Sequence, residues 1–308
     1  MEKNEQQMPR LGEPVPAFEA MTTKGKISFP DDYKGKWVIL FSHPADFTPI
    51  CTTEILTFGA RTEEFRALNC ELVGLSVDSR NSHIAWLKTI REKIEYKGMK
   101  DVKVGFPIID DVAMKVASLY GMIQPGESQT AAVRAVFFVD PKGVLRAMIY
   151  YPLALGRNFD EIRRVLVGLQ TIDAFGIALP ADWRPGDEVI VPMKGDDQEK
   201  VPEGAKCYDW FFCTKPLPKE EIGRKLGEGL TPLHCTTEEA SRGKPLLSCA
   251  FVSLQSGDGR QRPLRSIPGS GIAVRRATRG AVRAPRAVFC PLFAVLRVRS
   301  IRRRTPRG

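Results

Sequence analysis

The chain has 308 residues, of which 43% are hydrophobic, and a formal charge of +10. This length and composition suit a packed globular core with extensions, and the start of the chain lacks the apolar run of a signal peptide. No stretch of about 18 apolar residues offers a membrane span, so we expect a cytoplasmic protein without membrane contact. Seven cysteines without a C-x-x-C pair argue against a disulfide-rich secreted scaffold and against a zinc ribbon.

Strand-like and helix-like patterns alternate through the first 175 residues. After a small hairpin in residues 11–30, they predict strands at 37–41, 71–78, 104–110, 131–140 and 144–151, and helices after residue 51, at 81–96, at 112–120 and from residue 158. Because strands and helices alternate, we expect crossover connections and a partly parallel sheet. The predicted fold class is therefore α/β.

A thiol follows the first buried strand, inside the segment His43–Glu54. Helical spacing begins beyond Cys51, which places this cysteine near a helix N-terminus, where unpaired N–H groups and the helix dipole favour negative charge. The hydroxyl of Thr48, three residues upstream, can reach the sulfur or the atom that the sulfur attacks. A buried structural cysteine is the alternative. The two prolines and the polar loop around Cys51 favour an unburied, reactive thiol.

The spacing Pro44-x-x-x-Thr48-x-x-Cys51, followed by Thr52-Thr53-Glu54, resembles the active-site signature of the peroxiredoxins. These are thiol peroxidases, and the resemblance implies a thioredoxin-like core over residues 1–175. It also implies that the Cys51 thiolate attacks the O–O bond of hydrogen peroxide or an alkyl hydroperoxide and becomes a sulfenic acid. Neither a metal nor an organic cofactor is expected, and Pro44 would shield the sulfenic acid from water.

Arg134 interrupts an otherwise apolar strand. A charged side chain at a buried position needs an anionic partner, whereas at a sheet edge its charge would lie in water. The resemblance favours the buried position, because it implies that Arg134 and Thr48 hold the thiolate and the peroxide. It further implies that Glu54 orients Arg134 and that Arg157 orders the active-site loop. His43 is expected to line the substrate pocket.

Three other side chains have residue types that are common in functional sites. His83 and Trp86 lie in the first turns of the helix at 81–96, where capping and packing are the expected roles. Cys70 stands beside a strand and is expected in the core.

The segment 176–230 is rich in proline, and its aromatic stretch between Cys207 and Cys213 predicts that it packs onto another surface. In archaeal peroxiredoxins, which this sequence resembles, such an extension crosses a dimer interface and holds a cysteine pair. The resemblance therefore implies a homo-oligomer, a dimer or a decamer, in which Cys213 condenses with the sulfenic acid of the partner subunit. A thioredoxin-like reductant would complete the cycle. Two buried cysteines in an aromatic cluster are the alternative, above all for Cys207.

The positive charge is concentrated in the last part of the chain. Residues 241–308 carry a net charge of +15, whereas residues 1–240 carry −5. A composition of Arg, Gly, Pro and Ser without helix or strand period predicts a disordered tail over residues 231–308, which attracts nucleic acid non-specifically. A second Cys-Thr-Thr-Glu at 235–238 lacks the upstream proline and threonine, so we interpret it as coincidence.

Two other functions compete with the peroxidase. A nucleic-acid-binding protein would use the Arg-rich tail as its interface. A thiol-disulfide reductase would use Cys51, but that chemistry requires a second sulfur where this chain has Thr48. The sequence favours the peroxidase over both.

Overall fold

A computed structural model describes residues 8–192, 201 and 203–227. Contacts within the chain place all of them in one unit, Met1–Lys244. The Arg-rich tail and the second Cys-Thr-Thr-Glu lie outside the described residues, so the expectations for them stay predictions. Among the helices that are described, none is long and apolar enough to cross a membrane.

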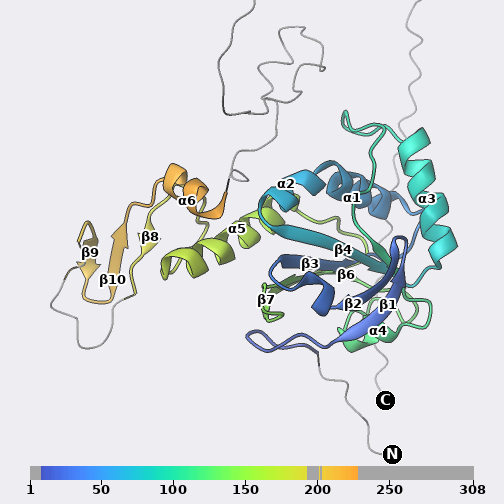
Figure 1. Ribbon diagram of the computed structural model, residues 1–308, viewed down its shortest axis with the longest axis horizontal. Helices are drawn as coiled ribbons and strands as arrows, with labels where there is room; N and C mark the ends of the chain where they lie inside the picture. The colour runs from blue at the N-terminus through green and yellow to red at the C-terminus, as the bar shows by residue number, and fades with distance from the viewer. Residues whose placement is uncertain (1–7, 193–200, 202, 228–308) are drawn as a thin grey trace, which may run out of the picture. The chain divides into compact units, whose positions relative to one another are not determined.

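A seven-stranded mixed sheet forms the centre of the fold (Figure 1). Its strands are β1 (Phe18–Thr22), β2 (Gly25–Phe29), β3 (Trp37–Ser42), β4 (Cys70–Ser76), β5 (Ile108–Asp110), β6 (Arg134–Val139) and β7 (Leu145–Tyr151). Their order in space is β2-β1-β5-β4-β3-β6-β7. Because β3, β4 and β5 run parallel and β6 is antiparallel to β3, the predicted α/β class with a partly parallel sheet is confirmed.

Helices cover both faces of this sheet. They are α1 (Pro49–Ala60), α2 (Thr62–Ala67), α3 (Arg80–Lys93), α4 (Lys115–Leu119) and α5 (Phe159–Phe175), with a short 3-10 turn η1 (Asp31–Tyr33). Successive strand residues point to opposite faces. Ile39 and Phe41 of β3 therefore join the apolar cluster with α1, α2, α3 and α5, whereas Val38 and Leu40 join the cluster with α4. Figure 1 shows α1 and α2 on one side of β3 and β4, and α4 on the other.

Several elements are shorter than their sequence patterns. Strand β5 begins four residues later than expected, directly after Pro107, which has no N–H for a sheet hydrogen bond. Helix α4 begins three residues later than expected, because Met114 before it has a left-handed backbone with φ of 53°. Helix α3 ends at Lys93, ahead of the expected end at Tyr96.

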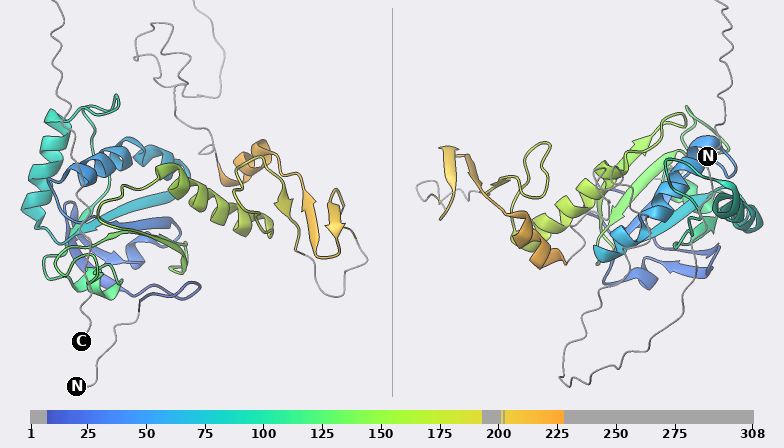
Figure 2. Two further views of the ribbon diagram at one scale, coloured as in Figure 1. Left: turned by 180° about the vertical axis from the view of Figure 1, so that it is seen from behind. Right: turned by 90° about the horizontal axis from the view of Figure 1, so that it is seen from above.

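The segment after α5 packs against that helix. It contains β8 (Val189–Ile190), β9 (Lys206–Asp209) and β10 (Phe212–Lys215), in the order β8-β10-β9, and α6 (Lys219–Leu226). Trp183, Val189 and Ile222 are buried in the same apolar cluster as Ile162 and Leu166 of α5. Figure 2 shows α6 beside α5. The proline-rich segment thus packs on its own chain, and its packing on a partner subunit stays a prediction.

Candidate active site

Cys51 is the third residue of α1, after the loop that follows β3. Thr48 is the N-cap of this helix and Pro49 is its first residue, a position that favours proline because its missing N–H would have no helical partner. The local sequence thus determines where the helix begins. It brings the free thiol of Cys51 next to the unpaired N–H groups of the first turn.

The side chain of Cys51 is buried, with an exposed fraction of 0%. The expectation that two prolines and a polar loop keep this thiol unburied is therefore wrong. The first turns of α1 pack into the apolar cluster that contains Ile55 and Phe58, and Arg134 lies against the sulfur. Because this interior has a low dielectric constant, charges near the sulfur act on it more strongly than they would in water.

Arg134, the first residue of β6, contacts the sulfur directly. Its Nη1 lies 3.3 Å from Sγ of Cys51 and donates to Oε2 of Glu54 at 2.7 Å. Its Nε and Nη2 donate to the carbonyl oxygen of Leu153 at 3.0 and 2.8 Å. Only 3% of Arg134 is exposed, so the alternative of an edge residue with its charge in water is excluded. Partners on all three nitrogens fix the plane of the guanidinium.

Glu54 lies three residues after Cys51 and joins two arginines. Besides the bond from Arg134, it accepts hydrogen bonds from Nη1 and from the backbone N–H of Arg157, at 2.8 and 2.9 Å. Nη2 of Arg157 donates to backbone carbonyls of β3 and β6. Burial lowers the pKa of the Arg157 guanidinium, and Glu54 opposes this shift. Two guanidinium groups and one carboxylate leave a net positive charge beside the sulfur.

The other predicted site residues lie in the loop before α1. The hydroxyl of Thr48 donates to a carbonyl of the same loop at 2.9 Å, and no described hydrogen bond joins it to Cys51. Pro44 is half-buried. His43 is fully buried and bonds to Asp46. The structure therefore brings Arg134, Glu54 and Arg157 together at the sulfur, and it places Thr48 nearby in sequence with its hydrogen directed elsewhere.

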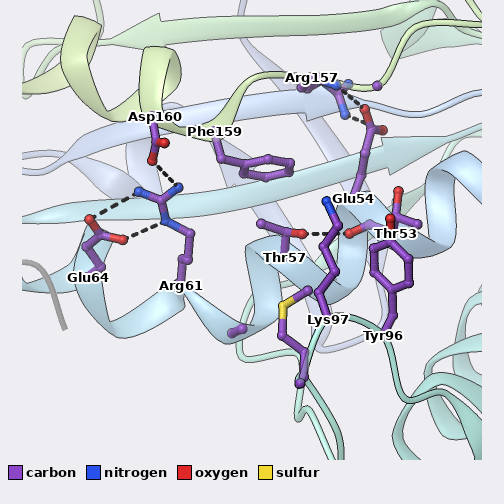
Figure 3. A pocket seen from close by; sticks show the side chains of 14 residues that line it. Thr53, Glu54, Thr57, Arg61, Glu64, Tyr96, Lys97, Arg157, Phe159 and Asp160 are labelled. Carbon is purple, nitrogen blue, oxygen red and sulfur yellow. Dashed lines mark hydrogen bonds and ion pairs between the residues drawn. The ribbon is translucent and has the colours of Figure 1, made fainter. Parts of the chain in front are cut away.

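A pocket of about 650 Å³ flanks α1 on the side of Glu54. Figure 3 shows Glu54 and Arg157 joined at this pocket, with Tyr96 and Lys97 among the other lining side chains. Cys51 is not among the lining residues of this cavity. Glu54 lines this pocket although only 1% of it is exposed, and the sulfur is as fully buried.

Comparison with known proteins identifies the family. The profile of the AhpC/TSA family matches residues 11–148, and the profile of the C-terminal domain of 1-Cys peroxiredoxin matches residues 168–204. A peroxiredoxin of Methanosarcina mazei is 56% identical over 214 residues, which cover 68% of this chain and 98% of that protein. The chain belongs to the peroxiredoxin family.

Solved peroxiredoxin structures agree with this assignment. The yeast mitochondrial 1-Cys peroxiredoxin is 38% identical, with a TM-score of 0.61 over 68% of this chain and 100% of its own. A mutant form of peroxiredoxin 6 of Arenicola marina is 33% identical, with a TM-score of 0.58 over 68% of this chain and 99% of its own. The predicted thioredoxin-like fold and the assignment as a peroxidase, which is an oxidoreductase, are thereby confirmed.

The cysteine pair of this peroxiredoxin is oxidised. Cys207 on β9 and Cys213 on β10 lie opposite each other and form a disulfide within the chain. Cys213 is buried and Cys207 is half-buried. The free cysteines among the described residues are Cys51 and Cys70, and Cys70 is buried as expected. In this state Cys213 has no thiol with which to condense with a sulfenic acid.

Asp46 of this peroxiredoxin binds two histidines, although the sequence did not point to it as a site residue. One histidine is His43, three residues away, and the other is His83 on α3. His83 is buried, as packing predicts, but it is not the cap of α3, because Ser79 has that role. The spacing of His43 and Asp46 is a local signal, whereas no local pattern links either residue to His83.

Proposed function

We propose that this peroxiredoxin reduces hydrogen peroxide and small alkyl hydroperoxides through the thiolate of Cys51. The observation that carries this proposal is the contact of Arg134 with Cys51 in a buried cluster with excess positive charge. The thiolate attacks one peroxide oxygen and the O–O bond breaks. Cys51 becomes a sulfenic acid, and the other oxygen leaves as hydroxide or alkoxide, which takes up a proton to give water or an alcohol.

Each residue of the site has a distinct part in this step. Arg134 stabilises the thiolate and the negative charge that develops on the leaving oxygen, and Thr48 orients the peroxide with its hydroxyl oxygen. Glu54 orients Arg134, because one of its oxygens accepts from that guanidinium at 2.7 Å. Arg157 fixes Glu54 from the other side. Pro44 shields the sulfenic acid from water, and His43 lines the substrate pocket.

Resolution of the sulfenic acid uses the extension. The thiol of Cys213 from the partner subunit condenses with the Cys51 sulfenic acid, which forms a disulfide and releases water. The thiolate of Cys207 then displaces Cys51 from this mixed disulfide, and the product is the Cys207–Cys213 pair that the structure contains. A thioredoxin-like dithiol reduces that pair. A cycle that consumes thiol reductant suits the reducing cytoplasm, the location that the sequence predicts.

Two surfaces support assembly into a homodimer. Strand β7 is an end strand of the sheet with β6 as its neighbour, and its first residue, Leu145, also bonds to Gly12 and Glu13. Beyond Leu145, one row of its backbone groups can pair with a second copy. On the extension, Tyr208, Trp210 and Phe211 are 56%, 57% and 62% exposed. Exposed apolar patches of this kind mark protein–protein contacts, so a partner subunit is the occupant that we propose for these rings. We propose this dimer as the functional unit, on which a decamer could be built.

Mass spectrometry of the reduced protein after one equivalent of hydrogen peroxide tests the first step. We expect one oxygen or one disulfide at Cys51, and no peroxide consumption by Cys51→Ser. Cys70→Ser is the matched control, because burial raises the pKa of the Cys70 thiol and makes it unreactive. Peroxide consumption by Cys51→Ser at the parent rate would refute the function.

Non-reducing gels test the resolving step. Peroxide should produce a disulfide-linked dimer that accumulates in Cys207→Ser, because the mixed disulfide cannot be passed on. Cys213→Ser should not form it. A disulfide-linked dimer in Cys213→Ser would show that Cys207 is the resolving cysteine. If neither variant affects recycling, an external thiol resolves Cys51 in a one-cysteine cycle.

A further inference from the structure

Three buried side chains form a row beside the active-site loop. His43 and Asp46 belong to the loop between β3 and α1, and His83 lies in the first turn of α3. Oδ1 of Asp46 lies 3.0 Å from Nε2 of His43, and Oδ2 lies 2.8 Å from Nδ1 of His83. None of the three side chains is more than 1% exposed. Water therefore cannot compensate any unmatched donor or acceptor in this row.

The partners of His83 determine its protons. Its Nε2 lies 3.1 Å from the carbonyl oxygen of Ile109, which can only accept, so this nitrogen carries a hydrogen. Its Nδ1 faces a carboxylate oxygen of Asp46, and two lone pairs at 2.8 Å would repel each other without a proton between them. His83 therefore has a hydrogen on Nε2 and shares a second proton, at Nδ1, with Asp46.

The hydrogen-bond partners of His43 determine its protons in the same way. Its Nε2 donates to Asp46, and its buried Nδ1 has no hydrogen-bond partner among the described residues. Burial lowers the pKa of His43, which keeps this ring neutral. The pKa of Asp46 is about 2, because hydrogen bonds from both histidines outweigh its burial. The row thus has a neutral His43 with a bare Nδ1, and one proton between Asp46 and Nδ1 of His83.

We propose that Asp46 and His83 are positioning residues of the peroxidase site, which hold the His43–Thr48 loop on α3 and fix the tautomer of His43 through a shared buried proton. This inference rests on the proposed function of Cys51. The loop needs such an anchor, because Phe47 has a left-handed backbone with φ of 56°, which is strained for a residue with a side chain. The side chain of Asp46 supplies two of the anchoring bonds, and its N–H supplies a third to Asp78 at 2.9 Å.

A metal ion is the competing occupant of this row. The ligand atoms of the three residues lie within 4.8 Å of one another, and two imidazoles with a carboxylate are a ligand set that zinc accepts. However, the nitrogen-to-oxygen separations of 2.8 and 3.0 Å are those of direct hydrogen bonds. Protons therefore account for the geometry without a metal.

Nitrogen NMR of the full chain with ¹⁵N-labelled histidine tests the proton count. The chain has three histidines, and His234→Asn removes the one outside the row. At pH 7.5 we expect two protonated ring nitrogens for His83, and one protonated and one bare nitrogen for His43. A bare nitrogen on His83 would overturn the proposal, as would loss of its double protonation on addition of one equivalent of zinc chloride. This readout does not depend on peroxidase activity, so it separates failure of this inference from failure of the proposed function.

Two substitutions test the positioning role. In Asp46→Asn, the amide can accept from His43 and donate to a neutral His83, so both hydrogen bonds of residue 46 form without the shared proton. Asp46→Ala removes both bonds. We expect Asp46→Ala to lower the second-order rate constant with hydrogen peroxide by about ten- to a hundredfold, since misplacement of reacting groups by about 1 Å has effects of that size. Asp46→Asn should keep most of the parent rate constant.

Circular dichroism and the melting temperature show whether each variant is folded. A folded Asp46→Ala that reacts with peroxide at the parent rate would overturn the positioning role. If Asp46→Ala does not fold, His83→Gln replaces it, because glutamine at this position cannot bridge Asp46 and Ile109 in the manner of the ring. In a folded His83→Gln we expect a rate loss of the same size, and an unchanged rate would again overturn the proposal.

Discussion

Arg134 and Cys51 are 83 residues apart in the chain, and they meet with Nη1 of the guanidinium 3.3 Å from the sulfur. The same Nη1 donates to Glu54, so the group that contacts the sulfur is held by a carboxylate on the helix of Cys51 itself. The nucleophile, its charge partner and the residue that orients the partner therefore form one rigid unit between α1 and β6.

Arg134→Ala should slow the reaction with hydrogen peroxide by a hundredfold or more. Removal of one preorganised donor to a developing charge costs about 10² to 10³ in rate. Arg134→Lys should give an intermediate rate, because an ammonium can reach either the sulfur or Glu54 but cannot also hold Leu153 through a planar fork. Stopped-flow measurement of the two rates is the check. A rate of Arg134→Ala equal to that of the parent would show that Arg134 has only a structural role.

Glu54→Gln should destabilise the fold. The substitution leaves the buried guanidinium groups of Arg134 and Arg157 without an anion, and removal of one partner from a buried charge pair costs about 3–5 kcal/mol. We expect the melting temperature to fall by about 10 °C. Glu161→Gln is the matched control, since its partner Arg164 is partly exposed and the loss should be below about 1 kcal/mol. Equal melting temperatures for the two variants at one protein concentration would show that Glu54 does not stabilise the buried guanidinium groups.

The stability of the fold should decrease in two steps on acidification. Burial holds the pKa of His43 below its ordinary value of ~6.5. On acidification, His43 therefore binds a proton in the unfolded chain before it does so in the folded chain. The contribution of His43 to stability is therefore full above about pH 6.5 and decreases below it, by at most about 1.4 kcal/mol per pH unit.

Protonation of Asp46 causes the second decrease in stability. Its pKa is about 2 in the fold and ~3.9 in an unfolded chain, so its contribution is complete above about pH 4 and is lost as the pH falls towards 2. Urea unfolding over a pH series measures both steps. Asp46→Asn should remove the second step, and an equally steep decrease in that variant would show that other carboxylates cause it.

A chain that ends at Gly229 should keep the melting temperature and the peroxide rate of the full chain. The residues beyond carry high positive charge with little apolar periodicity, and such a segment cannot bury enough surface to offset its chain entropy. The shortened chain should lose any affinity for DNA or RNA, which in the full chain should fall steeply with salt. The apolar patch at residues 288–296 is the exception to this composition. Unfolding of the shortened chain would show that the tail belongs to the architecture.

Features that depend on neighbouring residues were predictable from the sequence. Cys51 lies at a helix start because Thr48 and Pro49 before it favour an N-cap and a first helical turn. Asn158 caps α5 as predicted, since its side chain accepts from the N–H groups two and three residues later. The hydrophobic periods also indicated the strands that form the centre of the sheet.

Features that depend on distant segments were decided by the tertiary structure. The burial of Cys51, the bond of Arg157 to Glu54 across 103 residues and the bond of His83 to Asp46 across 37 residues have no local pattern. A sequence shows which side chains are charged, but it does not show which of them will share one interior. In that interior the cost of an unpaired charge requires each group to find a partner, and only the packing of α1, α3 and β6 determines which partner is within reach.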